Sequence, residues 1–275
     1  MMTLKELHKK VMSFDDTPLM PVVFVGHGTP MNAIEDNEFV HEWNRLGSEL
    51  PKPRAILCVS AHWETRGTFV TAMDMPKTIH DFYGFPRELY NQRYAAPGSQ
   101  DLSAIVKDHV KAVELDYEWG LDHGSWSVLK HIYPLADVPV VQLSIDHFKG
   151  PEYHYELARE LFFLRSKGVL VIGSGNMIHN LRMVKVENGD FNTEYGYDWA
   201  FELNDIFKNK IQEENHNALI DFSHLHDSAR LAIPTPEHYI PLLYILALQK
   251  KGEEVRFFND KVIAGSLSMT SLIIS

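Results

Sequence analysis

The feature that most constrains this chain is a short apolar run, VVFV at residues 22–25, that stops abruptly at Gly26-His27-Gly28. A β-branched run bounded by glycine predicts a fully buried strand. In an open α/β sheet, ligands bind in the crevice at the carboxyl ends of the strands, and glycine lets ligand and backbone approach closely. His27 is therefore predicted to lie at a ligand-binding edge of a sheet, although a histidine packed inside a tight turn would explain this segment alone equally well.

The same pattern recurs twice further along the chain. The run AILCVS at 55–60 leads into His62, and the run VLVI at 169–172 leads into a glycine-rich segment that contains His179. Such runs alternate with segments of helical periodicity, which is typical of βαβ units. We therefore predict an α/β fold, a single catalytic domain over residues 1–275 with a largely parallel or mixed central sheet flanked by helices.

Apolar periodicity and turn residues predict the remaining elements. The predicted helices cover residues 36–50, 100–113, 151–167 and 198–214, and a short helix near 87–90 interrupts a long loop over 75–99. The further predicted strands cover residues 67–73, 138–145, 255–258 and 266–273. Ser125 is predicted to cap a helix that ends near Tyr133. Thr3 and Glu6 form a capping box that predicts a short amphipathic helix near residue 3.

The composition is that of an ordinary globular chain, and its charge argues against some partners. The formal net charge is −11 and Lys and Arg form no cluster, so we expect neither nucleic acid nor an anionic membrane as a partner. The single cysteine, Cys58, lies in an apolar run, which argues against disulfides and a thiolate metal site. Without a signal peptide or a run of transmembrane length, we expect a cytoplasmic protein, as a monomer or small homo-oligomer.

Histidine is unusually common, and several of the 15 histidines fall where chemistry is expected. His123 stands in a Gly-Ser loop, and His238 is predicted to lie in the first turn of a helix that Thr235 caps. Convergence of several imidazoles at one sheet edge indicates a metal, and imidazole and carboxylate ligands without thiolate suit zinc, iron(II) or manganese. Three other histidines in irregular sequence are predicted to be structural: His216, His224 and His226.

Six blocks of sequence resemble one known family. The blocks are GHGTPM around His27, SAHW around His62, TIHDFYGFP from Thr78, LDHGSW around His123, GSGNMIHNLR around His179 and IPTPEHYIPLLY around His238. With these blocks in order over essentially the whole chain, the sequence resembles the DODA-type (4,5-DOPA) extradiol aromatic ring-opening dioxygenases. These are class III extradiol enzymes related to the catalytic subunit of protocatechuate 4,5-dioxygenase.

The resemblance implies a mononuclear non-haem metal centre. The residues similar to the protein ligands of the family are His27, His62 and His238. Glu237 is an alternative third ligand or a residue that orients His238, because adjacent helical residues point about 100° apart and cannot both reach one ion. His179 is similar either to a further metal ligand or to a catalytic acid-base, and His123 to a catalytic histidine near substrate and dioxygen. The implied metal is Fe(II), and Zn(II) can occupy such a site in isolated protein.

The resemblance also implies a reaction. Enzymes of this family use dioxygen to open a catechol ring next to, rather than between, its hydroxyl-bearing carbons, which gives a semialdehyde. We expect a DOPA-like or other substituted catechol as the substrate. The residues expected to line its pocket are His80, Asp81, Tyr83 and Trp126, although packing within the loop would explain them equally well. The alternatives are a zinc-dependent hydrolase built on the same histidines and a non-enzymatic, Memo-like interaction protein.

Overall fold

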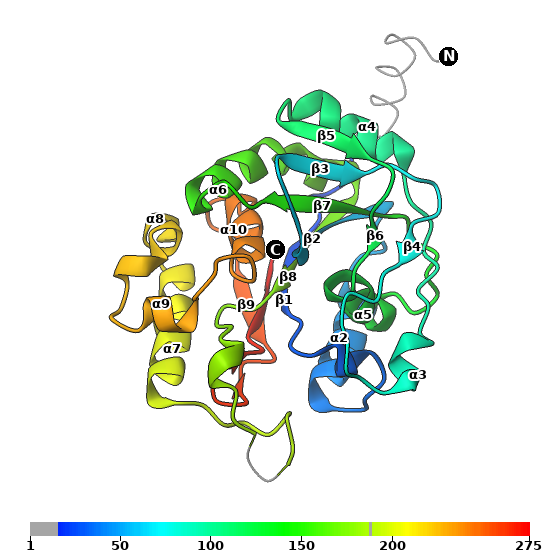
Figure 1. Cartoon of the computed structure of the whole chain (residues 1–275). Helices are drawn as coiled ribbons and strands as arrows, with labels where there is room; N and C mark the ends of the chain where they lie inside the picture. Colours follow the sequence, from blue (N-terminus) through cyan, green and yellow to red (C-terminus); the bar gives the residue numbers. More distant parts are fainter. Residues whose placement is uncertain (1–15, 187–188) are drawn as a thin grey trace.

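The computed structural model describes residues 16–186 and 189–275, which build one eight-stranded mixed sheet flanked by helices (Figure 1). The strand order is β5-β3-β7-β2-β8-β1-β12-β9. The central strands β7, β2, β8 and β1 are parallel, whereas β3 and β12 pair antiparallel with their central neighbours. The bounds are β1 Val22–Gly26, β2 Ala55–Thr65, β3 Thr68–Thr71, β5 Val113–Asp116, β7 Val140–Asp146, β8 Val169–Gly175, β9 Val255–Phe258 and β12 Ser271–Ile274.

Helices and two small ribbons surround this sheet. The α-helices are α2 Glu38–Glu49, α3 Arg87–Tyr90, α4 Gln100–His109, α5 His123–Ile132, α6 Pro151–Glu160, α7 Asp198–Gln212, α8 His216–Ile220, α9 Ala229–Ala232 and α10 Ile240–Ala247. Short 3₁₀ helices are η1 Pro30–Ala33, η2 Phe162–Lys167, η3 Leu181–Met183 and η4 Phe222–His224. The ribbons pair β4 Lys77–Thr78 with β6 Gly120–Leu121, and β10 Val262–Ile263 with β11 Leu267–Ser268.

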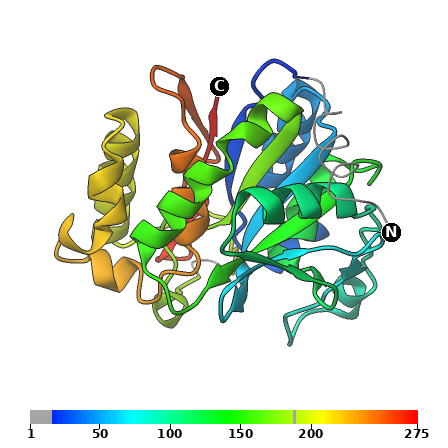
Figure 2. The same ribbon diagram turned by 90° about the horizontal axis from the view of Figure 1, so that it is seen from above.

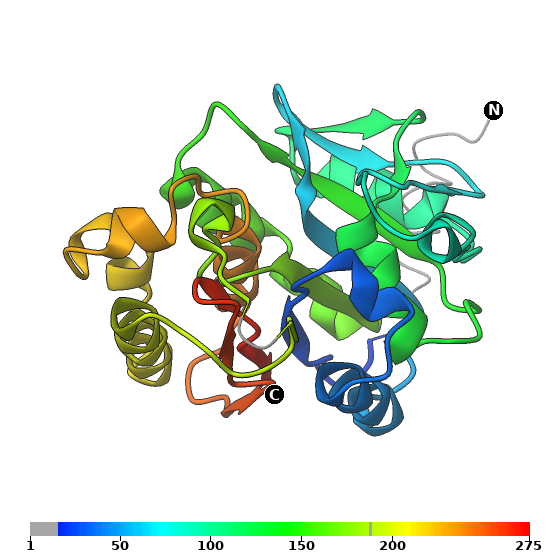
Figure 3. The same ribbon diagram turned by 60° about the horizontal axis from the view of Figure 1, so that its bottom comes forward.

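The two faces of the sheet build two separate cores. Val22 and Phe24 of β1 belong to the core that includes α4, α6, α7 and α10, whereas Val23 and Val25 belong to the core that includes α2 and α5. Figure 2 shows α4 and α6 side by side over one face, and Figures 1 and 3 place α7 to α9 and α2 on opposite sides of β9 and β12. Because successive strand residues point to opposite faces, a strand covered on both sides needs an unbroken apolar run.

The predicted α/β fold with a mixed sheet is confirmed. The predicted strand at 22–25 is β1, and the short helix predicted near 87–90 is α3. The helix predicted from Thr3 and Glu6 lies outside the described residues. Within residues 16–186 and 189–275, none of the helices is both long and apolar enough to cross a membrane.

Element boundaries differ from the predictions where pairing between distant segments decides them. The strand predicted to end at residue 60 continues to Thr65, because β2 bulges between Val59 and Glu64 and then pairs with β7 again. The helix predicted over 100–113 ends at His109, and Val113 is instead the first residue of β5, where it pairs with Thr68 of β3. The N-cap of α5 is Asp122 rather than Ser125, because the Asp122 carboxylate accepts a hydrogen bond from the Ser125 backbone N–H at 3.1 Å.

Two further predictions are corrected in the same way. The helix predicted over 151–167 is α6 followed by the 3₁₀ helix η2, which ends at Gly168 in the left-handed conformation. The strand predicted over 266–273 is divided into β11 and β12, which belong to two different sheets. Sequence periodicity cannot locate such a division, because both pieces are apolar and buried.

One buried ion pair joins segments that are far apart in the sequence. The guanidinium of Arg165 is fully buried and donates to Glu253 at 2.6 and 2.8 Å, to the Met20 carbonyl at 2.7 Å and to the Leu248 carbonyl at 2.6 Å. Burial raises the pKa of the Glu253 carboxyl, but the hydrogen bonds from Arg165 outweigh this and hold it below its ordinary value of 4.5. Arg165 therefore fixes the chain before β1 against the end of α10.

We expect Glu253→Gln to lower the free energy of unfolding by about 3 kcal/mol at pH 7, because it leaves a buried guanidinium without its counter-charge. Since the folded-state pKa of Glu253 is depressed, its contribution is present above pH 4.5 and is lost as pH falls further. The difference between wild type and variant in urea unfolding should therefore narrow below that pH. The exposed neighbour Glu254 provides the control Glu254→Gln, and equal losses in both variants would contradict the assignment.

Candidate active site

The site begins at the carboxyl ends of two parallel strands. His27 follows β1 directly, and its backbone N–H donates to the Gly175 carbonyl at the end of β8 at 3.0 Å. The His27 ring is 2% exposed, and its Nδ1 lies 3.0 Å from Ser174 Oγ. Because the Ser174 hydroxyl donates to the Gly124 carbonyl, it accepts from His27 Nδ1–H. A neutral His27 ring therefore presents the lone pair of Nε2 to the site.

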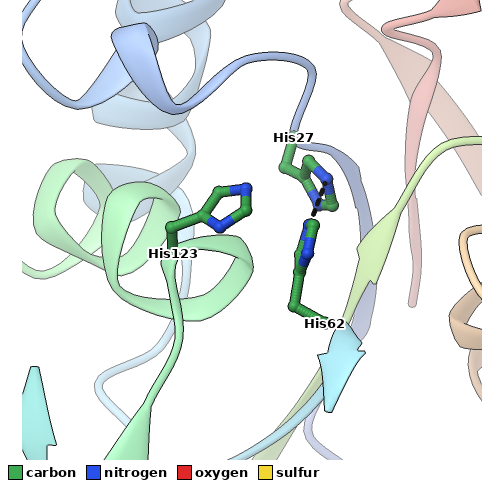
Figure 4. A group of neighbouring side chains, drawn as sticks. All are labelled: His27, His62 and His123. Carbon is green, nitrogen blue, oxygen red and sulfur yellow. Dashed lines mark hydrogen bonds between the residues drawn. The ribbon is translucent and has the colours of Figure 1, made fainter. Parts of the chain in front are cut away.

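The second histidine comes from the bulge in β2 rather than from a strand end. Between Val59 and Glu64 this strand advances five residues while β7 advances two, and His62 lies within the extra length. The bulge turns the His62 ring toward His27, and the two Nε2 atoms are 3.2 Å apart (Figure 4). The two rings thus point at one another from β2 and from the loop that follows β1.

His123 is the first residue of α5, and a carboxylate holds it in place. Asp81 accepts hydrogen bonds from the His123 backbone N–H at 2.8 Å and from its Nδ1 at 2.9 Å. The other edge of the His123 ring faces His62, with the ring centroids 3.9 Å apart (Figure 4). Gly124 permits this approach, because a Cβ there would lie 2.8 Å from His62 Cδ2.

His238 and His179 form a second group of ligand atoms in the same cavity as His27, His62 and His123. His238 lies in a turn before α10 rather than in a helix capped by Thr235, whose hydroxyl donates to Glu237 instead. The turn packs so closely against β8 that a Cβ on Gly175 would lie 2.1 Å from the His238 carbonyl oxygen. The rings of His179 and His238 are stacked, with centroids 3.5 Å apart, and His238 Nδ1 lies 3.0 Å from Glu237 Oε1.

Burial keeps four of these imidazoles uncharged, those of His27, His62, His179 and His238. Burial lowers the pKa of His62 to about 3 and that of His179 to about 4. It also holds the pKa values of His27 and His238 well below 6.5, and the neighbouring imidazoles lower them further. All four rings are therefore neutral at pH 7, and each keeps a lone pair on one ring nitrogen.

The donor set suits a divalent metal ion. Ligand atoms lie within 4.8 Å of one another in two groups, which are His27, His62 and His123, and His179, Glu237 and His238. Serine or carboxylate partners hold Nδ1 of three of the rings and leave Nε2 directed inward, which is the arrangement found around metal-bound histidines. Imidazole nitrogens without thiolate fit iron(II) or zinc.

The five histidines lie along one cavity of about 590 Å³. Its other lining residues are mainly apolar and aromatic, and they come from the segments after β1, β4 and β8 and from β11: Gly28, Thr29, Pro30, Met31, Glu35, Phe82, Tyr83, Phe85, Leu181, Val184, Phe191 and Leu267. A cavity with apolar walls and convergent polar groups at one end is typical of a small-molecule site, and this one is large enough for a single substituted aromatic ring.

Of the four residues predicted to contact substrate, one lines the cavity and three do not. Tyr83 lines the cavity and is 92% exposed. Asp81 lies behind the histidines as the partner of His123, and Trp126 is fully buried with its Nε1–H donating to the Ile79 carbonyl at 2.8 Å. His80 Nε2 lies 3.0 Å from the Gln92 carbonyl, outside the cavity lining. Three of the four therefore lie outside the lining and support the site from behind.

Sequence reasoning missed the residues that orient the histidines and most of the apolar wall. Ser174 stands in the Gly-Ser-Gly segment at the end of β8, and a metal-binding histidine needs such a partner for its second nitrogen. That requirement could have suggested Ser174. Phe82, Phe85 and Phe191 carried no such signal, because aromatic residues in loops more often pack than bind a ligand.

Neutral imidazoles converging in an apolar cavity at the carboxyl edge of a parallel sheet define a metal-dependent enzyme site of the α/β class. Over residues 18–264, the chain matches the family described as the catalytic LigB subunit of aromatic ring-opening dioxygenase. The chain belongs to this family. It is thus an oxidoreductase of the extradiol dioxygenase class, rather than the zinc hydrolase or the interaction protein that the residues alone left open.

Individual relatives agree with the family match. The chain is 46% identical over 259 residues to 4,5-DOPA dioxygenase extradiol of Escherichia coli (strain K12), which covers 92% of this chain and 94% of that protein. It is 34% identical over 259 residues to 4,5-DOPA dioxygenase extradiol of Beta vulgaris, covering 90% and 94%. A crystal structure of an uncharacterized protein from Escherichia coli K12 superposes with a TM-score of 0.80 at 42% identity, covering 93% of this chain and all of that one.

We expect Asp81→Asn to lower ring-cleaving activity about 10- to 100-fold without unfolding the protein, because the amide no longer fixes the His123 ring. Oxygen uptake and circular dichroism measure the two effects. Asp74→Asn, at an exposed position in the loop before β4, is the matched control. Full activity in Asp81→Asn would show that the orientation of His123 does not matter.

Proposed function

We propose that the protein catalyses extradiol cleavage of a catechol by dioxygen at a mononuclear non-haem Fe(II) centre. The observation that carries the proposal is the convergence of five imidazoles at one end of an apolar, partly aromatic cavity in a chain of the LigB family. The substrate is proposed to be a DOPA-like or other substituted catechol, since two relatives are named 4,5-DOPA dioxygenase extradiol.

His27, His62 and His238 are proposed to hold the metal. The ring centroid of His238 lies 5.3 Å from that of His27 and 5.0 Å from that of His62, which supports this set. Glu237 then orients His238 through Nδ1, as its 3.0 Å contact supports. Fe(II) bound there would act as a Lewis acid that lowers the pKa of a catechol hydroxyl and as the redox partner of dioxygen, and Zn(II) would fit the same nitrogens without redox chemistry.

His123 and His179 are proposed to handle protons. Because Asp81 holds the Nδ1–H of His123, a neutral ring has a free lone pair on Nε2 with which to accept a proton from a catechol hydroxyl. The ring returns that proton to an oxygen of the opened product. The His179 ring lies on His238, and no side chain among the described residues bonds it, so either nitrogen is available to a substrate oxygen. A fourth metal ligand is the alternative role for His179.

The walls of the cavity are proposed to bind the flat ring and exclude water. Phe82 packs edge-on against the His123 ring, with the centroids 5.6 Å apart, and also against Phe85 at 5.4 Å. These contacts place an aromatic wall directly beside the proposed proton acceptor. Apolar walls strengthen electrostatic interactions within the site, because little water is left to screen them.

Anaerobic reconstitution with ferrous iron, followed by oxygen uptake and absorbance scans with a panel of substituted catechols, tests the proposal. We expect oxygen consumption matched by a yellow semialdehyde product. Reconstitution with zinc is the matched control and should give neither signal. A filled metal site with no oxygen uptake on any catechol would contradict the proposed function.

Histidine variants separate ligands from proton carriers. We expect His62→Ala to lose both bound metal and turnover, because it removes one of the proposed ligands. We expect His179→Ala to retain the metal and lose turnover by about 10²-fold or more, as for removal of a general acid-base. Metal analysis after dialysis and oxygen uptake measure both, with the exposed His41→Ala as the control. Metal loss in His179→Ala would make His179 a ligand.

A further inference from the structure

The lining of the cavity includes acidic charge but no basic charge among the described residues. Among the described residues that line it, Glu35 is the one carboxylate, and no Lys or Arg is present. The histidines lie at the buried end, with His27 2% exposed, whereas Glu35 is partly exposed. Glu35 therefore lies on the solvent side of the cavity, where a substituent on a bound ring can reach it.

One oxygen of the Glu35 carboxylate is held by a hydrogen bond from a described residue, and the other is not. It follows η1, and its backbone N–H donates to the Met31 carbonyl at 3.0 Å. Asn192 Nδ2 donates to Glu35 Oε2 at 3.1 Å. Within residues 16–186 and 189–275, Oε1 accepts no hydrogen bond, and no cationic side chain pairs with this carboxylate. One oxygen therefore remains available to a ligand.

Arg182 follows the lining residue Leu181 but does not line the cavity itself, and two lysines near the cavity contact other groups. Lys185, next to the lining residue Val184, contacts Tyr195, with its Nζ 3.1 Å from the hydroxyl and 5.0 Å from the ring centroid. Lys130 donates to the Ala33 carbonyl at 2.8 Å and to Gln92. Among the described residues that line the cavity, a carboxylate substituent thus finds the Glu35 carboxylate and no Lys or Arg.

We propose that Glu35 is a specificity-determining residue that favours catechols with an ammonium group on the side chain over catechols whose side chain carries only a carboxylate. This inference rests on the proposed function, because it assigns the substituent of the same substrate. For a zwitterionic side chain, the ammonium group faces Glu35 Oε1 and the carboxylate faces solvent. An ammonium group within reach gains a charge-assisted hydrogen bond, whereas a carboxylate there is repelled.

Three catechols of similar size test the proposal: 4-(2-aminoethyl)catechol, 4-ethylcatechol and 3,4-dihydroxyphenylacetate. We expect wild-type kcat/KM to fall in that order. We expect Glu35→Gln to reduce the ratio of the first to the third roughly three- to tenfold, as for loss of one partly exposed charged hydrogen bond. Glu35→Asp, which keeps the charge, should keep the order.

Asp36→Asn is the matched control, because it removes the same charge one residue away and outside the cavity lining. An unchanged ratio in Glu35→Gln, or an equal change in Asp36→Asn, would overturn the proposal and leave only the effect of the overall negative charge. Circular dichroism of each variant checks the fold.

A binding measurement separates this proposal from the proposed function. Titration calorimetry of the zinc-loaded protein with the same three catechols under argon reports affinity without turnover. We expect the same order of dissociation constants and the same loss of discrimination in Glu35→Gln. If no catechol is turned over yet this order holds, the proposed function fails and the role of Glu35 stands. If catechols are turned over but bind without discrimination by charge, the role of Glu35 is wrong.

Discussion

The structure depends on holding uncharged imidazoles against one another in a buried space. Two Nε2 atoms 3.2 Å apart cannot belong to two protonated rings, because both would then be donors, and burial prevents this by lowering the pKa values of His27 and His62. Each ring also needs a partner for Nδ1, because an unpaired polar atom in a dry interior is costly. Ser174, Asp81 and Glu237 supply three of these partners from β8, the loop after β4 and the turn before α10.

Much of the architecture could be predicted, because an unbroken apolar run has few alternatives to a strand covered on both faces. The runs that became β1 and β8 end in glycine, and His27 lies at the carboxyl edge where a ligand was expected. The five histidines that line the cavity were all candidates from sequence, and glycine stands next to His27 and His123 and near His179. The parallel pairing of β1 with β8 brings His27 and His179 to one edge of the sheet.

The remaining features depend on contacts between distant segments. His62 reaches the site through a bulge, and a bulge is defined only by the partner strand β7. His238 lies in a turn rather than a helix, and its backbone carbonyl packs directly against Gly175, which has no side chain. The loop residues proved hardest to assign, since Asp81 and Tyr83 are two positions apart and yet lie on different sides of the histidines.

The bulge in β2 also limits how the length of this chain can change. Side chains alternate between the two faces of a strand, so the loss or gain of one residue between Val59 and Glu64 would turn His62 toward the opposite core. Substitutions that preserve the count leave the ring where it is. The segment from Val59 to Glu64 is therefore closed to insertion and deletion as long as His62 is to face the cavity.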